Sequence, residues 1–275
     1  MQKQYKSDII ILNNNEYKKE GYNMAITISI ALQKGGVGKT TTALNLASTL
    51  GFKGKKVLLI DMDDQCNTTY ASGVDRPAKT ITDVLGDECT VDEAIIQCKY
   101  YDILAADDYL ANVGIANVKS TLLKDAIGTI KNRYDYIIID TPPALGNLSY
   151  TSLVASDYVI VPAEPRPFAL QGLGALHRTI SSIQKHQNPN LKVLGILLIK
   201  YNNRTVLNRD VKDLIDDFSG KMHTKLFNTT IREGVAVGEA QMLRKPLIDY
   251  AKNSKPNIDY KALTTEILHM LEGEG

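Results

Sequence analysis

The sequence is poor in cysteine, lacks long apolar segments and carries almost no excess charge. Its three cysteines, Cys66, Cys89 and Cys98, form no CxxC pair and have no histidine-rich partner, which indicates a reduced, cytosolic chain. No apolar stretch approaches the roughly 20 residues that span a bilayer, and the run 9–12 is shorter than a signal-peptide core. Because the formal net charge is only +1, any nucleic-acid site must be a local patch.

The 275 residues allow one large domain or two small ones. Apolar runs, nearly continuous in Ile, Val and Leu, predict strands at 26–32, 56–60, 101–105, 136–139, 158–161 and 193–199. Helical patterns predict helices at 40–51, 112–131, 147–155, 170–186, 206–218 and 258–271, with loops at 188–190 and 255–257. This alternation predicts one doubly wound α/β domain over residues 24–275, with a mostly parallel sheet and helices on both faces.

Residues 1–23 precede the first convincing strand, and two explanations of them stay open. Residues 18–21 read Lys-Lys-Glu-Gly, which suitable codons encode as a bacterial ribosome-binding sequence. The segment is then an upstream region read as protein, with the true start at Met24. The other explanation is a disordered arm, and the nucleotide sequence or the native N-terminal peptide distinguishes the two.

A glycine-rich loop follows the first predicted strand. It contains Lys34, Gly35, Gly36, Val37, Gly38, Lys39, Thr40 and Thr41. Its glycines allow backbone N–H groups to face phosphate oxygens, and the next helix adds the positive end of its dipole. We expect Lys39 to reach the β- and γ-phosphates and the Thr40 hydroxyl to ligate Mg²⁺. Gln33 replaces the first glycine of GxxxxGK[ST], yet strand, loop and helix together predict a phosphate-binding loop.

Carboxylates follow two further predicted strands. Asp61 and Asp63 come at alternate positions after the second strand, and burying both without compensation would cost several kcal/mol each. A Mg²⁺–phosphate centre explains them, with one on the metal's side and the other orienting an attacking water. The alternative is a solvated turn, in which Asp is common. Asp140 ends the strand 136–139, as the second metal-side carboxylate does in phosphate-loop NTPases.

Together these segments closely resemble the ParA/Soj family of partition ATPases, within the MinD/ParA class that has a deviant phosphate loop. The stretches that carry the resemblance are VLLIDMDDQCNTT, YDYIIIDTPPALGNLSYTSLVASDYVIVPAEPRPFALQGL and TTIREGVAVGEAQMLRKPLIDY. Their order, spacing and flanking residues all match, from about residue 24 to the C-terminus. The resemblance implies an ATPase with ATP and Mg²⁺ as cofactors, slow until DNA and a ParB-like partner stimulate it.

The same resemblance implies roles for individual residues. Residues 34–41 bind ATP; Lys34 reaches across a nucleotide-sandwich homodimer to phosphates bound by the partner subunit, whereas Lys39 serves its own subunit. Asp63 positions the attacking water, and the Mg²⁺ side consists of Thr40, Asp61 and Asp140. The chain departs from the family's DxDPQGN, because Asp64 replaces proline and Cys66 replaces glycine. We expect the extra carboxylate to slow or retune hydrolysis.

The resemblance also implies nonspecific binding of double-stranded DNA by the ATP dimer. Arg204 and Arg232 match positions at which relatives present DNA-contacting arginines. Other cations of the same half that can widen this patch are Lys200, Arg209, Lys225, Arg244 and Lys245. No helix-turn-helix region precedes Met24, so we expect a ParB-like centromere-binding adaptor to supply specificity. The expected location is the cytosol, on the nucleoid, and no membrane partner is expected.

Three other functions compete with this interpretation. A MinD-like positioning ATPase would end in a basic amphipathic helix. Here the last segment carries one lysine, Lys261, and four acids: Asp259, Glu266, Glu272 and Glu274. We therefore expect its apolar stripe, Ile258, Leu263, Ile267, Leu268 and Leu271, to pack in the core. Iron–sulfur relatives use cysteines at places that this chain does not match. A nucleotide-gated scaffold with little hydrolysis stays open because of Asp64.

Overall fold

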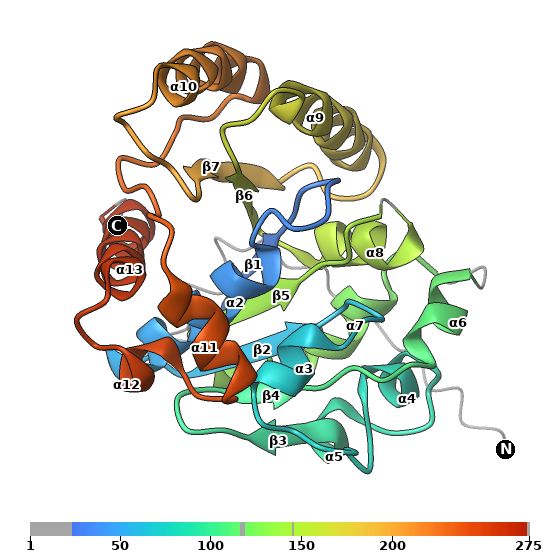
Figure 1. Cartoon of the computed structure of the whole chain (residues 1–275). Helices are drawn as coiled ribbons and strands as arrows, with labels where there is room; N and C mark the ends of the chain where they lie inside the picture. Colours follow the sequence, from blue (N-terminus) through green and yellow to red (C-terminus); the bar gives the residue numbers. More distant parts are fainter. Residues whose placement is uncertain (1–23, 116–118, 145, 274–275) are drawn as a thin grey trace, which may run out of the picture.

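The computed structural model describes residues 24–115, 119–144 and 146–273. Its described part forms a seven-stranded sheet in the order β3-β4-β2-β5-β1-β6-β7 (Figure 1). The strands are β1 (Ile26–Ile30), β2 (Val57–Asp61), β3 (Ile95–Gln97), β4 (Asp102–Leu104), β5 (Tyr136–Asp140), β6 (Tyr158–Ala163) and β7 (Lys192–Leu198). Only β3, at one edge, pairs antiparallel among the strands described. The doubly wound α/β prediction is confirmed, and the interpretations of residues 1–23 lie outside the described residues.

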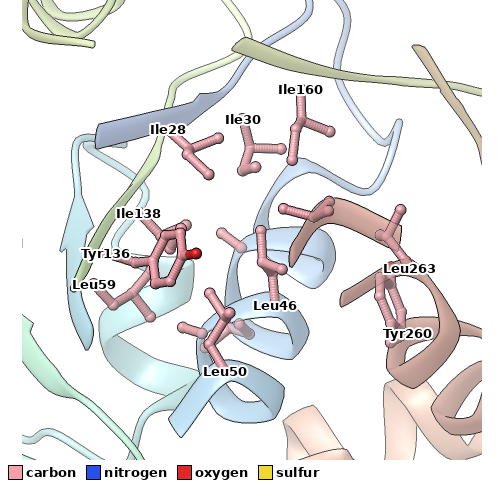
Figure 2. Close-up of a cluster of buried hydrophobic side chains, with 14 of the residues drawn as sticks. Ile28, Ile30, Leu46, Leu50, Leu59, Tyr136, Ile138, Ile160, Tyr260 and Leu263 are labelled. Atoms are coloured by element: carbon pink, nitrogen blue, oxygen red, sulfur yellow. The ribbon is translucent and has the colours of Figure 1, made fainter. Parts of the chain in front are cut away.

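Helices cover both faces of the sheet, as the continuous apolar strands predict. One face packs against α2 (Lys39–Phe52) and α13 (Lys255–Glu272), and the other against α7 (Leu122–Gly128), α8 (Asn147–Ala155) and α9 (Ala169–His186). Figure 2 shows the first cluster, to which three elements contribute Ile28, Ile30, Leu46, Leu50, Tyr260 and Leu263. The remaining helices are α3 (Asn67–Ala71), α4 (Ile81–Leu85), α5 (Val91–Ala94), α6 (Leu110–Ile115), η1 (Lys131–Arg133), α10 (Val206–Ser219), η2 (Gly220–Met222), α11 (Val235–Met242) and α12 (Leu247–Tyr250).

Two local predictions were wrong. The single helix expected at 112–131 is divided into α6, α7 and η1, and residues 116–118 lie outside the described part. Thr121, the residue before α7, and Lys119 both donate to Asp125 in the first turn of that helix. The loop expected at 255–257 is the first turn of α13, because proline is tolerated where a helix's N–H groups have no intrahelical partner.

The final helix packs as its apolar stripe predicts. Leu263 and Ile267 are fully buried, Leu268 and Leu271 pack against the same core, and only Ile258 of the stripe stays half exposed. None of the described helices is long and apolar enough to cross a membrane.

The acidic residues of α13 bind other parts of the fold. Glu266 accepts hydrogen bonds from the backbone N–H groups of Asn228 and Thr229, and Asp259 binds Arg232. Glu272 accepts from Lys55 and from the Tyr136 hydroxyl. These carboxylates therefore fasten the loop 228–232 and the helix itself to the domain.

We expect Gly51→Ala to destabilise the fold by about 1–3 kcal/mol, although alanine normally favours a helix. A Cβ at residue 51 would lie 1.7 Å from the carbonyl oxygen of Tyr100, so backbone would have to move. Denaturant unfolding measures the change. Gly128→Ala is the control, because nothing lies within 4 Å of a Cβ there; an equal loss in both variants would contradict the steric explanation.

Candidate nucleotide-binding site

The phosphate-binding loop connects β1 to α2 at the carboxyl edge of the sheet. Gly36 and Gly38 both have φ of 72°, a left-handed conformation that glycine adopts without strain. A Cβ on Gly38 would also meet the Ile199 side chain at 2.8 Å. Gly38 is the N-cap of α2, and no side chain caps this end of the helix. The first backbone N–H groups of α2 are therefore available to bind an anion.

The two lysines of this loop have different surroundings. Lys39 is 6% exposed, and its ammonium donates to the backbone carbonyl of Lys34 at 3.0 Å. Burial lowers the pKa of Lys39, and the nearby charges of Asp140 and Asp63 oppose that shift. Lys34 is half-buried, and its ammonium forms no ion pair with any described residue. Lys39 is therefore directed into the site of its own subunit, whereas the Lys34 ammonium has no ion-pair partner among the described residues.

Two aspartates lie side by side under the loop. Asp61 and Asp140 are register partners at the ends of β2 and β5, and neither is exposed. Burial raises the pKa of both carboxyls, and the Asp140 charge further raises that of Asp61. The structure thus concentrates negative charge where no water screens it, which is costly without a cation.

Hydroxyl groups orient these carboxylates. Thr40 and Thr68 each donate to Oδ2 of Asp140 at 2.7 Å. Thr69 donates both its backbone N–H and its hydroxyl to Asp61 Oδ2 at 2.8 Å. Thr68 and Thr69 belong to α3, so this short helix sits directly on the two carboxylates.

The donor set fits Mg²⁺. Asp140 Oδ1 is buried and has no hydrogen-bond partner among the described residues, and the neighbouring donors are carboxylate and hydroxyl oxygens. No group of three or more His, Cys, Asp or Glu side chains in the described part forms a complete metal cage. Mg²⁺ characteristically binds through one or two carboxylates together with substrate phosphates and water, so an incomplete oxygen site is what it requires.

Asp63 stands at the cleft side of the same turn. The N–H of Gln65 donates to Asp63 Oδ1 at 3.1 Å, and the N–H of Cys66 donates to its backbone carbonyl at 2.9 Å. Burial raises the pKa of Asp63, and the Asp64 carboxyl adds to that rise. Cys66 has φ of 53°, a conformation that favours glycine. The two departures from the family pattern therefore bear directly on Asp63.

These elements enclose a cleft of about 530 Å³. Its lining includes Asp63, the loop, Tyr70 of α3, Lys200, and Gln241 and Met242 of α11. The Gln241 amide donates to the Thr41 hydroxyl at 3.2 Å. Sequence reasoning missed the α11 wall, and it named Lys200 among the cations able to widen the DNA patch. The structure places Lys200 in the lining of the cleft, 4.0 Å from Glu164.

The two predicted DNA-binding arginines lie on neighbouring segments, since the Tyr201 N–H donates to the Ile231 carbonyl. Arg204 is exposed, and its guanidinium forms no ion pair within the described part of the chain. Arg232 differs, because its Nε and Nη2 bind the Asp259 carboxylate in a bidentate pair, with 45% of its side chain exposed. Arg209 binds the Asn203 carbonyl, and Arg244 binds Tyr70 and Asp75.

Comparison with known proteins agrees with this site. The AAA domain family model matches residues 25–193. The sporulation initiation inhibitor protein Soj of Bacillus subtilis is 37% identical over 252 residues, which cover 89% of this chain and 98% of Soj. The chain belongs to the ParA/Soj family of partition ATPases. The chromosome partitioning protein ParA of Caulobacter vibrioides is 36% identical over 88% of this chain and 93% of its own.

Two solved structures that are similar to this chain contain a bound nucleotide, and one of them also contains magnesium. Cobyrinic acid a,c-diamide synthase from Mycobacterium smegmatis, with bound ADP and magnesium, matches 92% of this chain and 97% of its own (TM-score 0.78, 30% identity). A putative plasmid partition protein from Borrelia burgdorferi, bound to AMPPNP, matches 91% of this chain and 100% of its own (TM-score 0.75, 26% identity). The chain is a P-loop ATPase with ATP and Mg²⁺ as cofactors.

In Mg²⁺-free buffer, we expect the thermal midpoint of unfolding to fall as the pH rises. Burial raises the pKa of Asp61 to about 7 and that of Asp140 to about 6, whereas aspartates of an unfolded chain ionise near pH ~4. The folded state holds its protons to higher pH, so stability is fully present below pH ~4 and is lost as the pH rises through 6 to 7. Differential scanning fluorimetry from pH 5 to about 8 measures it.

Asp140→Asn removes one carboxylate of the pair and is expected to flatten this pH dependence. Asp108→Asn, at an exposed carboxylate, is the matched control. The same slope in wild type and Asp140→Asn would refute the link between this pair and stability.

Proposed function

We propose that this ATPase works as a DNA-partitioning switch. Two ATP-bound subunits form a sandwich dimer that binds duplex DNA nonspecifically, and a ParB-like adaptor on the cargo stimulates hydrolysis and releases the dimer. The observation that carries the proposal is the contrast between Lys39, which is directed into its own site, and Lys34, which is uncommitted in the same loop. Such a switch needs a contact that forms when ATP is bound and is missing when ADP is bound.

Within one subunit, the geometry supports a separate role for each group of site residues. Residues 34–41 bind the phosphates, with Lys39 as the charged donor. Thr40, Asp61 and Asp140 would hold Mg²⁺, which would supply positive charge to offset that of the phosphates. The Asp63 carboxylate accepts a hydrogen bond from the attacking water and orients it.

The DNA-binding surface is proposed around Arg204 and Arg232 at the end of β7 and the loop before α11. Nonspecific binding consists mainly of contacts between cations and phosphates. Arg204 is the stronger candidate, because Asp259 already neutralises much of the Arg232 charge. The proposed location is the nucleoid in the cytosol, and the segregated cargo is a plasmid, a chromosome or a mobile element.

Two alternatives have observable consequences. A MinD-like protein would bind anionic liposomes through its last helix, whereas the apolar stripe of α13 packs in the core and its acids bind other parts of the fold. A scaffold that only gates on nucleotide would show no stimulated turnover with DNA and adaptor. Either result would replace the partition proposal.

We expect Lys34→Ala to bind ATP within about threefold of wild type and to lose the ATP-dependent dimer, because its ammonium acts on the partner's phosphates. Lys39→Ala is expected to lose tight nucleotide binding altogether. Light scattering with a slowly hydrolysed ATP analogue measures the dimer, and a fluorescent ATP analogue measures affinity. A normal dimer in Lys34→Ala would exclude the sandwich model.

Binding to random-sequence duplex DNA tests the proposed function directly. We expect binding with ATP and not with ADP, and a steep decrease with salt. Arg204→Ala is expected to weaken binding on all sequences and to reduce the salt slope by about one. Lys56→Ala, an exposed cation at the amino edge of the sheet, is the control. Binding that ignores the nucleotide, or an equal effect of both variants, would contradict the proposal.

A further inference from the structure

Arg244 occupies a backbone position that favours glycine. It follows α11 with φ of 55°, and its N–H donates to the Gln241 carbonyl while the next N–H, of Lys245, donates to Ala240. A left-handed residue just after a helix is usually glycine, because a side chain is strained there. An arginine at this position therefore has a cost that its side-chain contacts must offset.

The side chain of Arg244 reaches from α11 to α3. Its Nε donates to the Tyr70 carbonyl at 2.9 Å, its Nη1 pairs with Asp75 at 2.7 Å, and its guanidinium carbon lies 4.9 Å from the centre of the Tyr70 ring. Three contacts to one short segment fix the guanidinium, and only 25% of the side chain is exposed. Arg244 is therefore poorly placed for the DNA patch in which the sequence interpretation included it.

The segment that Arg244 holds is the one that orients the buried carboxylates. Tyr70 follows Thr68 and Thr69, whose hydroxyls donate to Asp140 and Asp61. On the other side, α11 donates from Gln241 to the phosphate loop. Tyr70, Gln241 and Met242 all line the nucleotide cleft. Arg244 thus joins two walls of this cleft that are far apart in the sequence.

We propose that Arg244 is a positioning residue for the magnesium–nucleotide site. By holding α3 against α11, it keeps the Thr68 and Thr69 hydroxyls on Asp140 and Asp61, so that the carboxylates face the cleft in the geometry that Mg²⁺ requires. Loss of the guanidinium leaves α3 attached through its hydrogen bonds to the carboxylates and the packing of Ala71 on the core. This inference rests on the proposed metal-side role of Asp61 and Asp140.

The test compares Mg²⁺ dependence in the full chain. Arg244→Gly removes the guanidinium and also relieves the left-handed strain, so we expect a thermal midpoint close to wild type. Retention of a fluorescent ATP analogue is titrated with Mg²⁺. We expect Arg244→Gly to need about three- to tenfold more Mg²⁺ for half-maximal retention, less than the ~10–100-fold typical of groups that touch metal ligands directly. Without Mg²⁺, its affinity for the analogue is expected to match wild type.

Three further variants make the result decisive. Lys245→Ala, the next residue, has no ion pair in the described part of the chain and is expected to behave as wild type. Asp75→Asn changes an exposed carboxylate and is expected to shift the Mg²⁺ requirement about twofold in the same direction, which keeps the test valid if Arg244→Gly does not fold. Asp140→Asn is expected to abolish the Mg²⁺ dependence.

Wild-type Mg²⁺ dependence in both Arg244→Gly and Asp75→Asn, with Asp140→Asn defective, would overturn the role of Arg244 alone. Wild-type dependence in Asp140→Asn would instead overturn the metal-side assignment on which the inference rests.

Discussion

The mutual repulsion of Asp61 and Asp140 is the constraint on which the site depends. Parallel pairing of β2 with β5 places the two carboxylates opposite each other and fully out of solvent. Of the two carboxyls, the Lys39 charge acts on Asp140 alone. The other stabilising contacts of the pair are hydrogen bonds from Thr40, Thr68, Thr69 and the N–H of Asp63. The helix α2, α3 and the two central strands are therefore arranged around buried negative charge that Lys39 offsets in part and that an added cation would offset further.

Much of this arrangement was predictable from the sequence, for a physical reason. Six strands were found because each is a continuous apolar run, and the motifs at their ends share one edge because the strands are parallel. The confirmed features are the fold class and the family; the roles of the individual site residues stay predictions. The loop between β1 and α2 was recognisable because its glycines are local requirements of the backbone.

The features that were missed depend on contacts between distant residues. β3 is three residues long and antiparallel, too short for periodicity to reveal. The α11 wall of the cleft is set by Gln241 bonding to Thr41, 200 positions away. Thr68 reaches Asp140 across 72 positions, and the pairing of Arg232 with Asp259 joins a loop to a helix. No local pattern encodes such partners, since each depends on how separate elements pack.

The Lys39 ammonium donates a hydrogen bond to the Lys34 carbonyl, so this carbonyl competes with a bound phosphate for the ammonium. The ammonium has three N–H donors, and a phosphate that draws it away from the carbonyl forfeits about 1 kcal/mol of the gross binding energy. When the phosphate leaves, the carbonyl is again available to accept this hydrogen bond. This carbonyl belongs to the other lysine of the loop, so each exchange of nucleotide frees or restrains the backbone at residue 34. Entry of a ligand into the cleft thereby changes the backbone hydrogen bonding of Lys34, the residue whose own ammonium makes no ion pair in the described part of the chain.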